Sequence, residues 1–140
     1  MVRIIHTNKV GTERKRAMRG ILIAIRGLAK KQVIDSDGLD MLAFILLSLE
    51  FIDETVERSA SAWEKREYWI KADRFRREWA WVIKEKALIR EAIVKKDWDT
   101  ITRCLAEISS KLSTMKVSEN HRMGKPWVGS YKAFRKKYVE

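Results

Sequence analysis

Glycine and proline are both absent from one long central stretch of this chain. From Leu39 to Met123, 85 consecutive positions contain neither residue, and all six glycines and the single proline lie outside it. These two residues are the usual breakers of helices, and the stretch is rich in leucine, alanine, glutamate, lysine and arginine, which favour helix. The sequence therefore predicts an all-α fold.

The length and composition fit a single globular domain covering residues 1–140. A chain of 140 residues can bury about two thirds of its unfolded surface, and 46% hydrophobic with 35% charged residues is typical of an ordered protein. The longest apolar run, Met41 to Leu47, is much shorter than the ~20 residues of a membrane-spanning helix. The one cysteine, Cys104, has no internal disulfide partner. We therefore expect a cytoplasmic protein with no membrane partner.

Hydrophobic spacing divides the chain into three parts. Residues 1–11 lack helical periodicity and predict an N-terminal arm, residues 12–116 predict a helical bundle, and residues 117–140 form a basic, aromatic tail. The first helix is expected to start near Thr12, with apolar side chains every three or four positions. The second is expected to start at the turn 35–38, which carries good capping residues, and it is apolar nearly all round from Leu39 to Ile52. Such a helix is predicted to be central.

The end of the second helix is less clearly marked. Ser61 followed by Glu64 is a capping-box pattern, which predicts a break there and a third helix from about residue 62 to residue 95. The alternative is one unbroken helix over residues 39–96, which only an oligomer could bury. Asp97 is expected to cap a fourth helix, and Ser130 to cap a short last one. We therefore predict an antiparallel bundle of four main helices with a short C-terminal helix.

Charge is distributed unevenly along the chain. The formal net charge is +11, and residues 1–34 contribute +8, whereas residues 35–70 contribute −6. A basic first helix lying antiparallel to an acidic second helix would be partly neutralised by it, and this is our structural interpretation of the pattern. A strong positive excess remains, and it favours polyanionic partners such as nucleic acid or an acidic protein surface.

The sequence gives no sign of catalysis. It contains no Glu-x-x-His, His-x-x-x-His or Cys-x-x-Cys spacing and no phosphate-binding glycine motif. Four carboxylates on one side of the second helix are interpreted as a face paired with nearby lysines and arginines: Glu50, Asp53, Glu54 and Glu57. We therefore predict a protein that is not an enzyme and that has no metal site and no cofactor.

The third helix combines aromatic and basic residues, a mixture suited to single-stranded nucleic acid, where cations meet phosphates and rings stack on bases. Trp81 is predicted to face away from the core side of this helix. Arg77 lies one turn before Trp81, at the spacing of an intramolecular cation–π pair, and tryptophans in a helical bundle more often belong to the core than to a binding surface. The predicted nucleic-acid-binding residues are Lys71, Arg74, Arg77, Trp81 and Lys84 with Arg135, Lys136 and Lys137 of the tail.

These observations predict a non-enzymatic, basic helical binding module that contacts RNA or single-stranded DNA within a larger assembly. The alternative is a homo-oligomeric or adaptor protein whose basic and aromatic surface binds an acidic protein. A helix-turn-helix is disfavoured, because the second helix begins with Asp35, Asp37 and Asp40 and would be repelled by DNA in a major groove.

Overall fold

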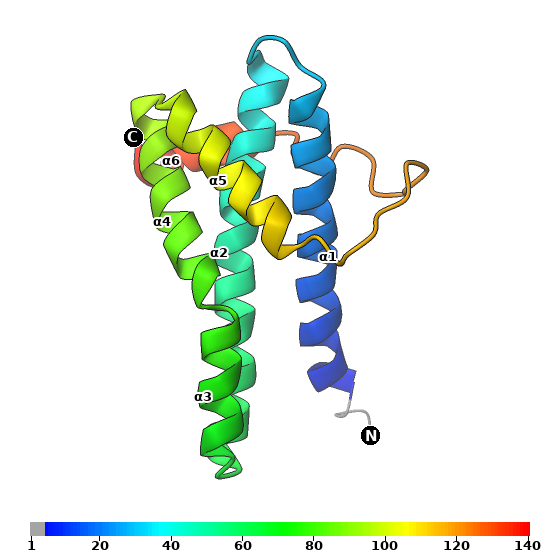
Figure 1. Ribbon diagram of the computed structural model, residues 1–140, viewed down its shortest axis with the longest axis vertical. Helices are drawn as coiled ribbons and strands as arrows, with labels where there is room; N and C mark the ends of the chain where they lie inside the picture. Colours follow the sequence, from blue (N-terminus) through cyan, green and yellow to red (C-terminus); the bar gives the residue numbers. More distant parts are fainter. Residues whose placement is uncertain (1–4) are drawn as a thin grey trace.

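The computed structural model describes residues 5–140, with side chains from Lys9 onward, and the described part contains six helices and no strand. Their bounds are α1 (Ile5–Ala29), α2 (Ser36–Lys65), α3 (Trp69–Glu78), α4 (Ala80–Lys95), α5 (Trp98–Lys111) and α6 (Ser130–Tyr138). In Figure 1, α1 runs up the molecule, α2 down, α3 and α4 up together and α5 down. The predicted antiparallel bundle of four main members with a short C-terminal helix is confirmed.

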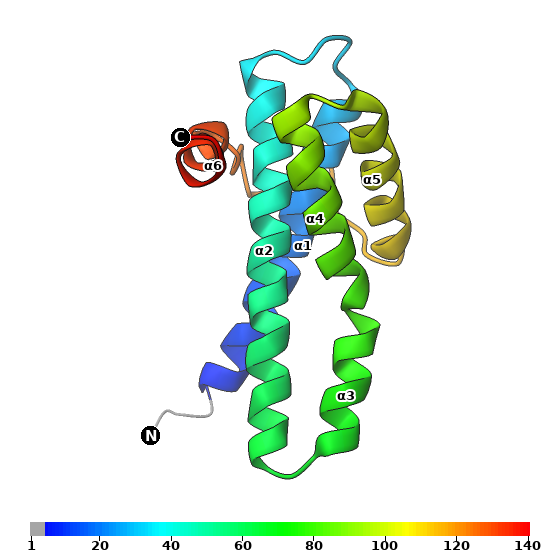
Figure 2. The same ribbon diagram turned by 90° about the vertical axis from the view of Figure 1, so that its left-hand side faces the viewer.

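Helix α2 is the centre of the bundle, as its all-round apolar sequence predicts. Leu42, Ile45, Leu46, Leu49 and Ile52 are each at most 1% exposed. The helix packs against α1, α3, α4 and α6, while α5 packs mainly on α4 and touches α1. Figure 2 shows α6 on one side of α2 and α4 with α5 on the other. Each neighbour covers a different side of the same apolar helix.

Two of the predicted helix starts are confirmed by their capping contacts. The backbone N–H of Gly38 donates to Asp35 Oδ1 over 2.8 Å, and this hydrogen bond lowers the pKa of the Asp35 carboxyl. At α5 the backbone N–H of Thr100 donates to Asp97 Oδ1 over 3.2 Å and caps the helix. The Thr100 hydroxyl donates to Asp97 Oδ2 over 2.7 Å and lowers the pKa of that carboxyl. Both caps are local in sequence, which is why spacing alone predicts them.

The predicted N-terminal arm is wrong where the structure describes it. Helix α1 already begins at Ile5 rather than near Thr12, and residues 1–4 of the predicted arm lie outside the described residues. Figure 2 shows the start of α1 turned away from α2, so this part of the helix has few neighbours to pack on. Apolar periodicity reflects packing against neighbours and does not mark a helical end that lies apart from them.

The predicted break at Ser61 is also wrong. Helix α2 continues through Ser61 to Lys65, and the chain reverses over residues 66–68, where Glu67 has a positive φ of 64°. A straight helix through Ser61 would have favoured an extended coiled coil, but the reversal follows only a few residues later and keeps the bundle closed. The backbone N–H of Tyr68 donates to the carbonyl of Trp63 over 2.9 Å and closes this turn. We call this end of the α2–α3 hairpin, residues 65–71, the hairpin tip.

The predicted third helix is divided in two at Trp79. Its backbone, with φ −106° and ψ 8°, leaves the helical region, although its N–H still donates to the Phe75 carbonyl over 3.2 Å. The irregular residue changes the helical phase between α3 and α4. Within α4, Ile83 is 53% exposed, whereas Ala92 is 3% exposed.

Helix α6 is held on α2 by a buried ring and by an unexpected cap. Phe134 is 1% exposed and belongs to the core. Ser130 was expected to cap the helix, but the N-cap is Gly129, and Asp40 of α2 accepts from the backbone N–H of Tyr131 over 2.9 Å. The cap thus comes from a residue about ninety positions away, which no local motif reveals.

Truncation of Leu46 tests the central position of α2. Leu46→Ala should lower the free energy of unfolding by about 2 to 5 kcal/mol, because it leaves a cavity among well-packed side chains. The matched control is Leu88→Ala, a truncation of the same residue at a 42% exposed position of α4, where we expect a change of about 0.5 kcal/mol or less. Equal losses in the two variants, measured by urea denaturation, would contradict a bundle built around α2.

Candidate nucleic-acid interface

The predicted binding residues lie in three separate places. Lys71, Arg74 and Arg77 are on α3, Trp81 and Lys84 are on α4, and Arg135, Lys136 and Lys137 are on α6. Figures 1 and 2 place α3 at the end of the molecule that carries the hairpin tip and α6 near the other end, on the far side of α2. The eight residues therefore do not form one continuous surface.

The prediction that Trp81 faces away from the core is wrong. Its ring is half-buried and stacks on Trp79, with centroids 6.2 Å apart. Trp79 in turn lies 6.2 Å from Phe75, and Phe75 meets Trp63 edge-on at 4.9 Å. We call these four residues the aromatic row. Arg77 forms an ion pair with Asp73 instead of covering Trp81. The row is a structural seam between α2, α3 and α4.

Arg14 of α1 ties this seam to the rest of the bundle. Its guanidinium lies 5.0 Å from the centroid of Phe75 and 5.7 Å from that of Trp79. It also donates to the Thr55 hydroxyl over 3.0 Å and to the Ser59 hydroxyl over 2.7 Å. Burial lowers the pKa of Arg14. A cation in these contacts stabilises the fold and is not available to a partner.

Several of the predicted cations are also engaged within the chain. Lys137 donates to Glu50 over 3.0 Å, and Arg135 lies 3.5 Å from Glu140. The ammonium of Lys71 lies 4.6 Å from the centroid of Trp63, although the side chain is exposed. Three of the predicted cations are exposed and have no ion pair or hydrogen bond within the described residues: Arg74, Lys84 and Lys136.

Four carboxylates of α2 form ion pairs with cations of α2, α3, α4 and α6 and not of α1, which corrects our interpretation of the charge pattern. Their ion pairs join Glu50 to Lys137 of α6 (3.0 Å), Asp53 to Lys86 of α4 (2.7 Å), Glu54 to Arg58 of α2 (3.3 Å) and Glu57 to Arg76 of α3 (3.0 Å). Within residues 9–140, helix α1 contributes no ion pair to this set. The reason is geometric: Glu50, Asp53 and Glu57 project toward α6, α4 and α3, while α1 packs on another side of α2.

Unpaired cations consequently accumulate on the outer side of α1. We call Lys9, Lys15, Arg16 and Arg19 the α1 basic face. At 3.6 residues per turn they fall within about 120° of arc and extend over about 15 Å. All four are exposed and have no hydrogen bond or ion pair within residues 9–140, and α1 contains a single carboxylate, Glu13. The net charge of +8 in residues 1–34 indicates a basic surface. We did not predict a binding site there, because we expected these cations to pair with the carboxylates of α2.

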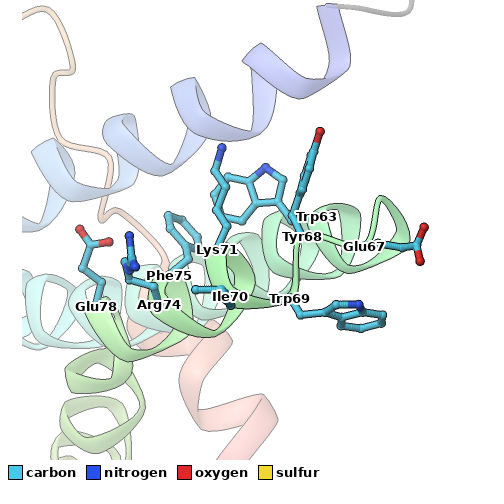
Figure 3. A pocket seen from close by; sticks show the side chains of 9 residues that line it. All are labelled: Trp63, Glu67, Tyr68, Trp69, Ile70, Lys71, Arg74, Phe75 and Glu78. Carbon is cyan, nitrogen blue, oxygen red and sulfur yellow. The ribbon is translucent and has the colours of Figure 1, made fainter.

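The hairpin tip presents a second group of uncommitted side chains. Tyr68, Trp69 and Ile70 are 55%, 59% and 75% exposed. They border an open hollow of about 850 Å³, whose lining also includes Lys71 and Arg74. Figure 3 shows Tyr68 and Lys71 projecting on the same side of the hairpin as Trp63, whereas Trp69 points away from them. The tip therefore offers rings and cations in more than one direction.

Arg76 fixes the tip to the body of the hairpin. Its guanidinium lies 3.0 Å from a carboxylate oxygen of Glu57 and 2.5 Å from one of Glu64, so that α3 is clamped to α2. The hydrogen bond from Arg76 lowers the pKa of the Glu64 carboxyl, and the two carboxylates raise the pKa of Arg76. The exposed rings next to this clamp are thus presented on a fixed backbone.

Cys104 carries the one thiol of the sequence, and it lies in the hydrophobic core. Cys104 is buried beside Glu85, which is 2% exposed, and burial raises the pKa of the thiol to about 11. A protonated thiol is a poor nucleophile and a poor metal ligand. In the part of the chain that the structure describes, no three His, Cys, Asp or Glu side chains gather into a metal-binding group. No helix there combines the length and apolar character needed to cross a bilayer.

Comparisons with protein-family models, with curated proteins and with solved structures find no match to this chain.

Removal of Arg76 should raise the pKa of Glu64. In Arg76→Ala the carboxyl loses the hydrogen bond that lowers its pKa, and an NMR titration of the glutamate side chains should show it returning to the ordinary range. Arg74→Ala, which deletes an unpaired neighbour on the same helix, is the control and should leave the titration of Glu64 nearly unchanged.

The same contact predicts the sign of the pH dependence. Because the folded-state pKa of Glu64 is depressed, its contribution to stability is present above the unfolded-state pKa and is lost as the pH falls through the folded-state value. Wild type should therefore lose more of the rigidity of the hairpin tip in acid than Arg76→Ala does, as measured by amide hydrogen exchange. An unchanged Glu64 pKa in Arg76→Ala would contradict the clamp.

Proposed function

We propose that this protein is a non-enzymatic binding module that contacts nucleic acid, RNA or single-stranded DNA, as part of a larger assembly. The observation that carries the proposal is the α1 basic face. Four exposed cations lie along one side of a helix and no carboxylate of the described structure pairs with them. A net charge of +11 adds a long-range attraction for polyanions.

Phosphate groups are the partners that such a row of cations suits. Each lysine or arginine that neutralises a phosphate releases a condensed counterion, and this release drives binding at low salt. A helix that presents cations along about 15 Å can follow several successive phosphates of a strand. The apolar side of α1 packs on α2. The exposed side would therefore bind a partner through its charged side chains.

Charge removal from α1 tests this proposal. Lys15→Gln/Arg19→Gln should weaken the binding of a short single-stranded oligonucleotide and make the slope of log K against log salt shallower by up to about 1.4, at about 0.7 per phosphate. Fluorescence anisotropy at several salt concentrations gives both quantities. The matched control is Lys84→Gln/Arg103→Gln, which removes the same two charges from a hollow between α4 and α5 and includes one residue of the predicted site.

The control should bind more tightly than the α1 variant and keep a steeper slope. Equal weakening in both would show that net charge alone attracts the polymer and would contradict a site on α1. If wild type binds no oligonucleotide at low salt and is purified without bound nucleic acid, the adaptor function remains, in which the same cations meet an acidic protein surface.

A further inference from the structure

We infer that the hairpin tip stacks on unpaired bases, with Tyr68 and Trp69 as stacking rings that point in different directions from the tip and with the nearby cations Lys71 and Arg74 for the flanking phosphates. The inference rests on the proposed function and deepens it, since it assigns the selectivity for single strands to one place. The α1 basic face attracts phosphates without distinguishing paired from unpaired strands. The hairpin tip adds exposed aromatic rings, which can stack on unpaired bases.

Tyr68 and Trp69 are the aromatic residues that the fold leaves uncommitted at this end of the molecule. Trp63, Phe75, Trp79 and Trp81 contact one another in the aromatic row. Tyr68 and Trp69, by contrast, form no ring pair and no cation–π contact within residues 9–140 and are more than half exposed. An exposed indole or phenol ring has a free π-face, which is the group that a base stacks on.

The tip is also pre-organised for such a contact. The turn is closed by the hydrogen bond from the Tyr68 N–H to the Trp63 carbonyl, and Arg76 clamps α3 to α2 just beyond it. Rings on a fixed backbone lose little conformational entropy when a ligand binds. The hollow that these rings border has a volume of about 850 Å³, and Figure 3 shows Tyr68 and Lys71 on one side of the hairpin and Trp69 on the other.

The charges around the tip favour a nucleic-acid strand as its occupant. Four exposed cations flank the rings in the sequence: Lys65, Arg66, Lys71 and Arg74. Two carboxylates, Glu67 and Glu78, line the same hollow as Lys71 and Arg74. Alternation of cations with rings is the pattern that contacts phosphates and bases in turn.

Substitution of Trp69 tests the inference. Trp69→Ala should weaken the binding of a single-stranded oligonucleotide by about 5-fold to 150-fold, the range measured for loss of one base–aromatic stack. The salt dependence should stay unchanged, because no cation is removed. Trp69→Phe keeps a stacking ring and should restore most of the affinity. The matched control is Trp98→Ala, which deletes a 43% exposed tryptophan on α5 and should bind like wild type.

The second measurement is the binding of a duplex of the same sequence. Its bases are already stacked, so Trp69→Ala should bind it as wild type does, while Lys15→Gln/Arg19→Gln should weaken both forms. Single-strand affinity unchanged in Trp69→Ala, with the α1 variant still weakened, would overturn the inference and leave the proposed function in place. Failure of wild type to bind either form would overturn both. Loss of binding to phosphatidylserine vesicles in Trp69→Ala, with oligonucleotide binding intact, would identify the tip as a membrane contact and overturn the inference.

Discussion

The structure depends on the burial of α2. Its apolar side chains point in several directions, and a helix of this kind is stable only when neighbours cover it on more than one side. Helix α1, the pair α3 and α4, and α6 each cover a different part of it. The short α6 is held there by Phe134 and by the capping contact of Asp40, so that even the last helix is positioned by residues of α2.

The packing of the other helices on α2 also determines which charged side chains have no ion-pair partner. The carboxylates of α2 lie toward the helices that approach from those sides, and Lys86, Arg76 and Lys137 neutralise them. Helix α1 packs through apolar side chains and through Arg14, whose guanidinium is bound to hydroxyls and aromatic rings. Lys9, Lys15, Arg16 and Arg19 are left exposed, whereas Arg26 donates to the carbonyl of Val117 over 2.7 Å. The proposed binding surface is thus a consequence of how the core is covered.

Local signals were sufficient for part of this fold. The all-round apolar pattern identified α2 as central, and Asp35 and Asp97 marked helix starts because a cap acts within a few residues. Ser61 and Glu64 carried the same kind of signal, but α2 remains helical through both, and Glu64 binds Arg76 of the next helix. The break at Trp79 contains no glycine or proline and coincides with the ring contacts of the aromatic row. Ion-pair partners and the exposure of Tyr68, Trp69 and Trp81 depend on which helices become neighbours, so spacing alone could not predict them.

We propose that polyanions bind the outer side of α1 and the hairpin tip. The most direct measurement is an NMR titration of the isotopically labelled protein with a short single-stranded oligonucleotide at low salt, following every assigned amide. We expect the largest shifts at Lys15, Arg16 and Arg19 and at Tyr68 and Trp69, and we expect them to disappear as salt is added. Shifts confined to α5 or α6, or none at an oligonucleotide concentration well above that of the protein, would contradict both proposed sites.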